Sequence, residues 1–321
     1  MAGTTGMAAM GAVRMLHELY AETDVLMPAL FVGHGSPMNG IEDNLFSNQW
    51  KKLGTQLPVP KAVLVVSAHW LTKGTFVTAV EKPQTIHDFG GFPQALFDAQ
   101  YPAPGDAQLA RSISQLITEP AIGLDHEWGL DHGSWTILKH IYPKADIPVL
   151  QLSIDYNQPP SYHYELAKAL AGLRKRGILI IGSGNMVHNL RMVDFARLNE
   201  DNYGFDWALE LNELFKAKIL AGDHQSLINY TTLHSASKLA IPTPDHYYPL
   251  LYTLGLQQPS DTVSFFNDRA VAGSLTMTSV VLGTGDWGLE TGDWRLGTGD
   301  WGLGSEDWGV RTGDWGLAAL G

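Results

Sequence analysis

The chain has 321 residues, of which 45% are apolar and 17% charged, so it can build a large core and does not have a disordered composition. Its formal net charge of −12 argues against nucleic acid or an anionic membrane as a partner. Cysteine is absent, which excludes disulfides, thiolate nucleophiles and cysteine-ligated metals. No apolar run reaches the roughly 20 residues of a membrane span, and the N-terminal region has no signal-peptide core. We therefore expect a cytoplasmic protein in which any metal is held by imidazole and oxygen.

Short apolar runs alternate with amphipathic segments along most of the chain. Residues 1–26, rich in Ala, Gly and Met, are expected to form a leader. The runs at 27–33, 61–68, 147–154, 178–182 and 274–282 predict strands, and 106–118, 160–176 and 205–220 predict helices. Strands that are apolar on both faces are typical of a parallel or mixed sheet covered by helices. The expected fold is therefore α/β, a single domain over 27–283 with a central mixed, mostly parallel sheet flanked by helices.

Four of the twelve histidines stand where this fold would bring them together. His34, His69 and His188 each follow an apolar run, and His246 opens a helix-like stretch. Open α/β sheets bind ligands outside the carboxyl ends of their strands. A lone histidine near a strand end is more often a hydrogen-bonded structural residue than a ligand. The joint pattern, in a chain without cysteine, nevertheless predicts that these imidazoles converge on one metal ion.

Other motifs carry less information. Ser36 does not fit a nucleophile elbow, because the Gly-x-Ser-x-Gly pattern is absent around it and Pro37 breaks the turn. The glycines at 182 and 184 follow a strand, but the spacing of a dinucleotide fingerprint and the lysine of a phosphate loop are missing. His132 lies at the expected start of a helix. His87 and Asp88 lie in a loop with aromatic residues and paired glycines, where we expect them to support the metal ligands.

Six segments together resemble one known family. In chain order they read Gly-His-Gly-Ser-Pro, Val-Ser-Ala-His-Trp, Ile-His-Asp-Phe-Gly-Gly-Phe-Pro, Asp-His-Gly-Ser-Trp, Gly-Asn-Met-Val-His-Asn and Pro-Thr-Pro-Asp-His-Tyr. They resemble the class III extradiol ring-cleaving dioxygenases, and within these the 4,5-DOPA extradiol dioxygenase branch. The resemblance runs from about Met27 to Gly283. It implies an α/β fold around a mixed sheet and a mononuclear non-haem metal centre.

The resemblance also implies roles for individual histidines. His34, His69 and His246 stand at the positions of metal ligands, and His188 is either a fourth ligand or the acid–base residue. His132 is expected to position the ring hydroxyl or the peroxide. His246 takes the place of a carboxylate, so the site departs from the two-histidine, one-carboxylate pattern. The candidate walls for a flat aromatic substrate are Trp70, Phe89, Phe92 and Tyr247.

The implied reaction opens the ring of a DOPA-like catechol with dioxygen to give a semialdehyde. Ring cleavage requires Fe(II), although an all-imidazole site also suits Zn(II), which has no redox chemistry. The substrates are therefore a small catechol and O2. An alternative is a zinc-dependent hydrolase or amidase, which would need a carboxylate general base from Asp88, Asp131 or Asp245. A third reading is a metal-binding scaffold that presents the C-terminal repeats.

The C-terminal segment repeats every seven residues from Thr284. Its tryptophans fall in register at 287, 294, 301, 308 and 315. The units are rich in glycine and lack the paired apolar positions of a coiled coil, and they are far shorter than the roughly 20 residues of a solenoid repeat. We therefore expect residues 284–321 to form a disordered, low-complexity tail without a part in catalysis.

Truncation after Gly283 tests this expectation. The melting temperature should stay within about 1–2 °C of the full chain, because a disordered tail contributes no packing. An enzyme should also keep its turnover, whereas a scaffold should lose its partners. A large fall in melting temperature would show that the tail packs on the domain.

Overall fold

One large sheet organises the fold. The computed structural model describes residue 18 and residues 20–285, so the expected tail, apart from its first two residues, and most of the expected leader lie outside the described residues. The sheet has eight strands in the order β4-β3-β5-β2-β6-β1-β10-β7. These strands are β1 (Ala29–Gly33), β2 (Ala62–Thr72), β3 (Thr75–Thr78), β4 (Ile122–Asp125), β5 (Val149–Asp155), β6 (Ile178–Gly184), β7 (Thr262–Phe266) and β10 (Ser279–Gly283). A separate pair is formed by β8 (Ala270–Val271) and β9 (Leu275–Thr276).

The sheet is mixed, with a parallel centre. β6 pairs in parallel with both of its neighbours, β1 and β2, and β2 pairs in parallel with β5. β10 runs antiparallel to β1 and β7, and β3 runs antiparallel to β5. The carboxyl ends of β5, β2, β6 and β1 consequently meet at one edge, where such sheets bind ligands. The predicted single-domain α/β fold with a mixed, mostly parallel sheet is confirmed.

Both faces of the central strands are buried under helices. Alternate residues of a strand point to opposite faces, and in β1 Leu30 and Val32 join one apolar cluster while Phe31 joins another. The first cluster includes Trp135, and the second includes Leu250. This double burial explains why the central strands are apolar at nearly every position.

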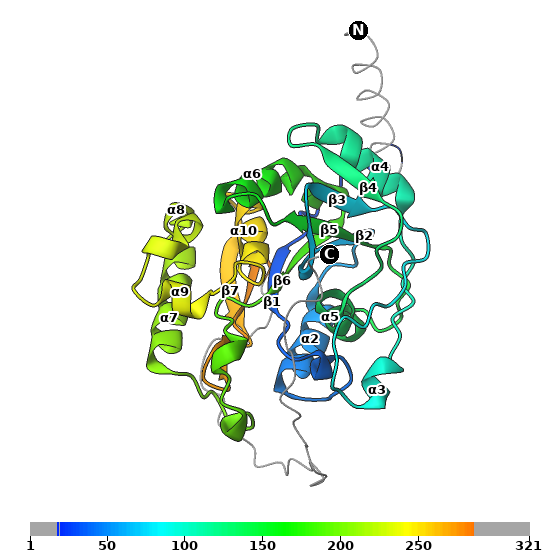
Figure 1. Cartoon of the computed structure of the whole chain (residues 1–321). Coiled ribbons are helices and arrows are strands. Elements are labelled where there is room, and N and C mark those ends of the chain that lie inside the picture. The colour runs from blue at the N-terminus through cyan, green and yellow to red at the C-terminus, as the bar shows by residue number, and fades with distance from the viewer. Residues whose placement is uncertain (1–17, 19, 286–321) are drawn as a thin grey trace. The chain divides into compact units, whose positions relative to one another are not determined.

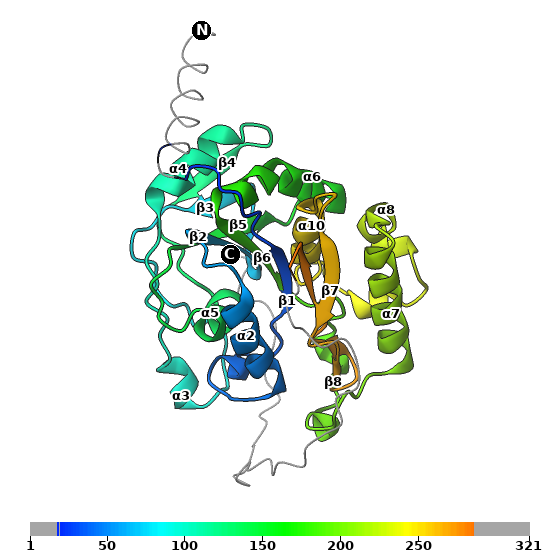
Figure 2. The same ribbon diagram turned by 180° about the vertical axis from the view of Figure 1, so that it is seen from behind.

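The helices divide between these two faces. The cluster with Leu30 contains residues of α2 and α5, and the cluster with Phe31 contains residues of α4, α6, α7 and α10. Figures 1 and 2 show α7 and α8 together beyond the β7 edge, and α4 beside β4 at the opposite edge. The helices are α2 (Leu45–Gln56), α3 (Gln94–Phe97), α4 (Ala107–Leu116), α5 (His132–Ile141), α6 (Pro160–Leu170), α7 (Asp206–Leu220), α8 (His224–Ile228), α9 (Ser237–Ala240) and α10 (Tyr248–Gly255). Short 3₁₀ helices are η1 (Pro37–Gly40), η2 (Ala171–Arg176), η3 (Leu190–Met192), η4 (Phe195–Arg197) and η5 (Tyr230–Thr232).

The predicted elements are confirmed in place, with differences at their ends. The strand predicted over 274–282 is divided into β9, which pairs with β8, and β10, which pairs with β1 and β7. Between them, Met277 lies against Gly33 at the end of β1. A Cβ on Gly33 would lie 2.5 Å from the Met277 carbonyl oxygen. The helix predicted over 160–176 is α-helical only to Leu170 and then continues as η2, which ends at Gly177 with a φ of 79°. The sequence did not predict β3, β4 and β7, which are short and carry several polar residues.

The largest departure concerns His69. The strand predicted to end at residue 68 continues to Thr72, and its register against β5 shifts between Val66 and Leu71. His69 therefore lies inside β2, within an irregular stretch, and not after the strand. Irregularities of this kind re-aim side chains and are frequent next to active sites.

The packed domain begins before Met27. Tyr20, within the expected leader, is buried in the core, and its hydroxyl donates to the Asp106 carboxylate at 2.5 Å. Within the described part of the chain, no helix is long and apolar enough to cross a bilayer.

A buried arginine joins four segments at the edge opposite the carboxyl ends of the central strands. The Arg174 guanidinium donates to the Asp261 carboxylate at 2.6 and 2.8 Å, and both side chains are fully buried. It also donates to the carbonyl oxygens of Met27, Leu256 and Leu282. Removing one partner of such a pair leaves an uncompensated buried charge.

We therefore expect Asp261→Asn to lower the free energy of unfolding by about 3–5 kcal/mol, measured by urea denaturation. Glu22→Gln is the matched control, because Glu22 pairs with Arg176 while its own side chain is 59% exposed. Exposed pairs of this kind contribute at most about 1 kcal/mol. Equal losses in the two variants would contradict the structural importance of the buried pair.

Candidate metal centre and active site

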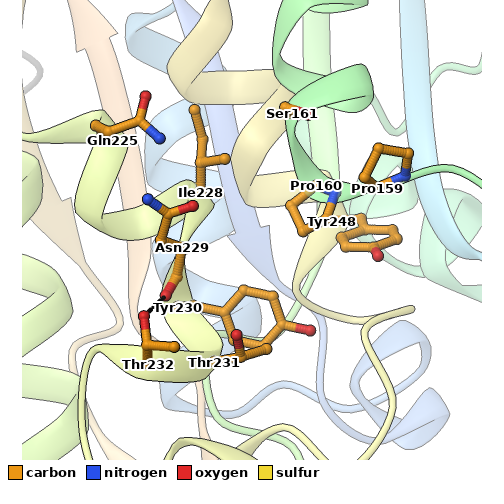
Figure 3. A pocket seen from close by; sticks show the side chains of 10 residues that line it. All are labelled: Pro159, Pro160, Ser161, Gln225, Ile228, Asn229, Tyr230, Thr231, Thr232 and Tyr248. Atoms are coloured by element: carbon orange, nitrogen blue, oxygen red, sulfur yellow. Dashed lines mark hydrogen bonds between the residues drawn. The ribbon is translucent and has the colours of Figure 1, made fainter.

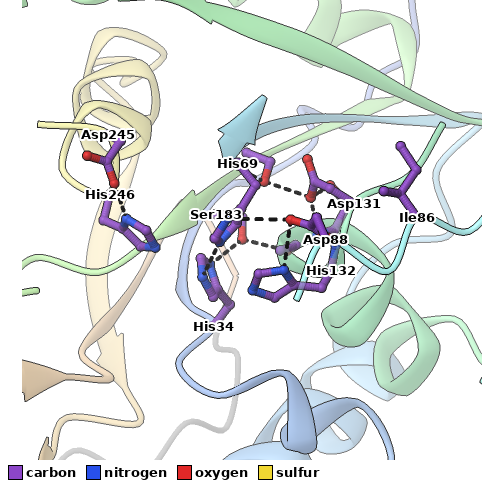
Figure 4. Close-up of polar contacts among 12 residues, drawn as sticks. His34, His69, Ile86, Asp88, Asp131, His132, Ser183, Asp245 and His246 are labelled. Atoms are coloured by element: carbon purple, nitrogen blue, oxygen red, sulfur yellow. Dashed lines mark hydrogen bonds and ion pairs between the residues drawn. The ribbon is translucent and has the colours of Figure 1, made fainter. Parts of the chain in front are cut away.

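The candidate site is assembled where neighbouring strands end (Figure 4). His34 directly follows β1, His69 lies near the end of β2, and Ser183 lies on β6 between these two strands. His132 is the first residue of α5, and His246 precedes α10 by two positions. Segments far apart in the sequence therefore meet at the carboxyl edge of the sheet.

Five imidazoles converge there. The ring centres of His34, His69 and His246 are 4.9, 5.0 and 5.2 Å apart. His132 lies 3.9 Å from His69 and 5.4 Å from His34, and His188 lies 3.5 Å from His246. The potential ligand atoms of His34, His69 and His132 all lie within 4.8 Å of one another, as do those of His188, Asp245 and His246.

Oxygen atoms lie close to Nδ1 of four of these rings and are hydrogen-bonded to three of them. The Ser183 hydroxyl donates to the Gly133 carbonyl at 2.5 Å, so it accepts from His34 Nδ1 at 3.0 Å. A carboxylate oxygen of Asp88 lies 2.9 Å from His132 Nδ1 and 3.5 Å from His69 Nδ1. Asp245 binds Nδ1 of the adjacent His246. Because the Nδ1 atoms of His34, His132 and His246 each face a hydrogen-bond acceptor, their protons belong on Nδ1 and their lone pairs on Nε2.

The Nε2 atoms then meet each other, and this arrangement fits a metal ion. His34 Nε2, which carries a lone pair, lies 3.0 Å from His69 Nε2. Two imidazole nitrogens at this distance can bind one metal ion when both present lone pairs to it. Histidine nitrogens are the usual neutral ligands of Zn²⁺ and Fe²⁺. The donor set therefore matches a divalent metal bound through Nε2.

Burial keeps His34 and His69 uncharged. It lowers the pKa of His34 well below its ordinary value, and the neighbouring His246 and His132 lower it further. The pKa of His69 is lowered for the same reasons, burial first and then His132. A protonated imidazole cannot bind a metal, so the low pKa values keep the ligands ready for it.

His188 differs from the other imidazoles in its geometry. Its ring stacks on that of His246 with an interplanar angle of 7°. Imidazole lone pairs lie in the plane of the ring, so two stacked parallel rings direct them within parallel planes that share no common point. Burial, and then His246, lower the pKa of His188, so this ring also is neutral near pH 7. An uncharged imidazole beside a metal centre is suited to accept a proton.

The buried carboxylate of Asp131 connects two segments of the site through hydrogen bonds. Asp131 accepts hydrogen bonds from the side chains of Ser67, Ser134 and Gln151 at 2.7–3.1 Å. Burial, and then the nearby Asp88, raise its pKa to about 6. Asp131 is the N-cap of α5, and Ser67 lies two residues before His69. The network thus joins the segments that carry His69 and His132.

The glycine-rich end of β6 serves close packing and not phosphate binding. A Cβ on Gly184 would lie 2.1 Å from the His246 carbonyl oxygen, which accepts from the Asn185 backbone at 2.9 Å. The absence of a side chain at Gly184 therefore lets the segment carrying His246 approach the sheet.

The predicted aromatic walls have different environments. Phe89 contacts His132 edge-on, with ring centres 5.7 Å apart, and Phe92 packs on Phe89. Trp70 is only 3% exposed and stacks on Trp128. Tyr247 is fully buried and donates its hydroxyl to Leu227. Phe89 and Phe92 are thus the predicted wall residues that stay near the surface of the site.

A separate cleft lies beside the segment that carries His246 (Figure 3). Its volume is about 570 Å³, and the rings of Tyr230 and Tyr248 form part of its wall. None of the five histidines lines it, and its lining residues carry no charged side chain. The other lining residues are Pro159, Pro160, Ser161, Gln225, Ile228, Asn229, Thr231 and Thr232.

Sequence reasoning found the histidines and missed most of their hydrogen-bond partners. Ser67, Gln151 and Ser183 are polar residues inside apolar strands, and this was the available signal. Buried polar side chains need partners, so each of them pointed to a polar site. Asp245 was named from the sequence as a candidate general base, and its position next to His246 was the signal for its contact with that ring.

Comparison with known proteins agrees with this geometry. Residues 29–286 match the family described as the catalytic LigB subunit of aromatic ring-opening dioxygenase. The chain is 49% identical over 261 residues to a 4,5-DOPA dioxygenase extradiol of Escherichia coli K12, covering 80% of this chain and 95% of that protein. It is 37% identical over 240 residues to the protein of the same name from Beta vulgaris, covering 72% of this chain and 87% of the relative.

A solved structure extends the likeness to the fold. The crystal structure of an uncharacterized protein from Escherichia coli K12 has a TM-score of 0.70 and 44% sequence identity, and the match covers 80% of this chain and all of that one. The likeness therefore includes both the fold and the segments that carry the five histidines. The chain belongs to the LigB family and is an extradiol aromatic ring-opening dioxygenase.

Proposed function

We propose that the protein cleaves the ring of a DOPA-like catechol with dioxygen, in an Fe(II)-dependent reaction that yields a ring-opened semialdehyde. The clustering of five imidazoles at the carboxyl edge of the sheet, three of them hydrogen-bonded to oxygen atoms at Nδ1, is the observation that carries this proposal. The DOPA-like substrate is supported by the names of the relatives from Escherichia coli and Beta vulgaris.

We propose His34, His69 and His246 as the metal ligands. Imidazoles bound to one ion with metal–nitrogen distances of about 2.1 Å have ring centres roughly 5 Å apart. The spacing of these three rings, 4.9–5.2 Å, is close to that value. His132 lies only 3.9 Å from His69, which is crowded for two ligands of one ion. We therefore place His132 beside the metal.

Fe(II), when bound, supplies open positions for the catechol oxygens and O2 and the redox chemistry that Zn(II) lacks. Zn(II) remains a metal that an all-imidazole site can hold. The protein's own contribution is to hold both reactants next to each other, which removes much of the entropy cost of their meeting.

His188 is the proposed acid–base residue. As a neutral imidazole it takes a proton from a catechol hydroxyl and returns it as the ring opens. Its backbone N–H donates to the Ala240 carbonyl at 2.9 Å, and its ring rests on His246, so its position is fixed. The Nδ1 of His132 is held by Asp88, which leaves Nε2 free to orient a substrate hydroxyl. Phe89, against His132, is the proposed contact for the substrate ring.

The hydrolase alternative finds little support in the site. A metal-bound hydroxide needs a free carboxylate as general base, but Asp88 and Asp245 each bind an imidazole Nδ1. Asp131 is fully buried and accepts hydrogen bonds from three side chains. No candidate carboxylate named from the sequence is therefore free to activate water.

Alanine at His34, His69 or His246 should remove the metal. Each substitution deletes one of three ligands, and a divalent ion bound by two imidazoles should dissociate on dialysis. Elemental analysis measures the metal content, and chelation of the wild type should lower its melting temperature, because the metal binds the folded state. His140→Ala is a control, because His140 is bonded to the Asn39 backbone outside this group. Full metal content in two of the three variants would exclude the site.

His188→Ala separates the two roles proposed for this residue. An acid–base residue should leave the metal content near that of the wild type while turnover falls by roughly 10²–10⁴-fold. Oxygen uptake and the yellow semialdehyde product are followed after anaerobic loading with Fe(II). Metal loss in parallel with activity would make His188 a ligand, and no oxygen uptake by the wild type with any catechol would exclude the dioxygenase proposal.

A further inference from the structure

Asp88 comes from outside the sheet, on a loop that is tied to the start of α5. Thr85 forms an isolated bridge with Leu130, and the Leu130 and Ile86 backbone N–H groups donate across it at 2.8 and 2.7 Å. The Trp135 indole N–H donates to the Ile86 carbonyl at 3.0 Å. These contacts hold the loop against the residues that directly precede His132, so the position of Asp88 is determined by α5 and not by a strand.

The carboxylate of Asp88 contacts two imidazoles of the centre. One oxygen lies 2.9 Å from His132 Nδ1 and 3.5 Å from His69 Nδ1. The other oxygen accepts the His132 backbone N–H at 2.9 Å. The side chain is only 19% exposed, so little water competes for these contacts. Among the described site residues, the other imidazole partners, Ser183 and Asp245, each accept from one ring.

We propose that Asp88 is a positioning residue that holds His69 and His132 together through their Nδ1 atoms. In this arrangement one carboxylate directs the Nε2 of a metal ligand and the Nε2 of its substrate-facing neighbour toward the same space. The effect on turnover rests on the proposed function, whereas the effects on metal binding and on the tautomers do not.

A carboxylate suits this position because it faces two N–H groups of His132, at Nδ1 and on the backbone, with His69 Nδ1 3.5 Å away. An ionised carboxylate offers only acceptors, with about four lone-pair positions on its two oxygens. An amide has nearly the same shape, but an NH₂ group, which is a donor, replaces one of the two oxygens. Asn at this position can satisfy His132 Nδ1 and the His132 backbone N–H only by placing an NH₂ group against one of them. The substitution therefore changes the hydrogen bonding of the site while the volume stays nearly constant.

The principal variant is Asp88→Asn in the full-length protein. Asp88→Glu keeps the charge but moves the carboxylate by one methylene group. Asp98→Asn is the matched control, because Asp98 lies on the same part of the chain, is exposed, and accepts from Gln94 away from the histidines. The measurements are Zn²⁺ affinity by chelator competition, the ¹⁵N–¹H signals of labelled histidines, and kcat and KM after Fe(II) loading.

Asp88→Asn should bind Zn²⁺ 10–100-fold more weakly, the usual effect of removing a partner behind a metal ligand. The Nδ1–H signal of His132, identified by its loss in His132→Gln, should shift or disappear. The loss of activity should appear as a lower kcat more than as a higher KM. Asp88→Glu should recover part of this activity. Asp98→Asn should stay within twofold of the wild type in every measurement.

Wild-type Zn²⁺ affinity together with an unchanged His132 signal in Asp88→Asn would overturn the proposal. If Asp88→Asn does not fold, Asp88→Glu decides, because unchanged affinity and tautomer in that variant contradict the proposed positioning. Failure of the proposed function has a different signature. In that case the wild type consumes no oxygen with catechols, while Zn²⁺ affinity and the imidazole signals still respond to Asp88→Asn.

Discussion

The hydrogen bonds that oxygen atoms accept from histidine Nδ1 are the interactions on which this centre depends. Without them each imidazole would exchange between two tautomers, and the nitrogen that faces the others would be undefined. Ser183, Asp88 and Asp245 remove this freedom for His34, His132 and His246. The lone pairs then point inward, and burial also lowers the pKa of His34 and His69. Inward-facing imidazole nitrogens are what make the edge of this sheet suited to a metal ion.

The order of the strands determines which donors can meet. β6 lies between β2 and β1, so the residues at the ends of three neighbouring strands belong to one small region. β6 contributes no imidazole to it directly. It contributes Ser183, which orients His34, and Gly184, whose missing side chain admits the backbone of His246. A larger residue at either position would displace a proposed ligand, although neither position binds the metal itself.

The remaining imidazoles arrive from opposite faces of the sheet. His132 begins α5, which packs with one apolar cluster, and His246 stands before α10, which packs with the other. The two covering layers thus meet at the carboxyl edge. The network around Asp131 connects α5 to β2 and β5 through Ser67 and Gln151. The packing of the core consequently also determines the geometry of the site, because a shift of α5 would move His132, Asp88 and Asp131 together.

The sequence by itself determined the strand positions and the candidate histidines. Apolar runs identify buried strands locally, and a histidine after such a run is visible without any knowledge of its neighbours. The resemblance of six short motifs added the family and the expected metal chemistry. The irregular stretch of β2 at His69 was not predictable, because it depends on the register against β5, to which no local pattern points.

Only the tertiary structure decided which residues hold the imidazoles. Ser183 is 149 residues from His34, and Asp88 is 44 residues from His132. Contacts at such separations follow from strand order and helix docking, which the sequence encodes through the packing of the whole core. The same holds for Tyr247. Its position beside His246 made it a candidate wall for the substrate, but its side chain is fully buried and its hydroxyl donates to the Leu227 carbonyl. Local chemistry names the groups that are able to act, and packing decides which of them face one another.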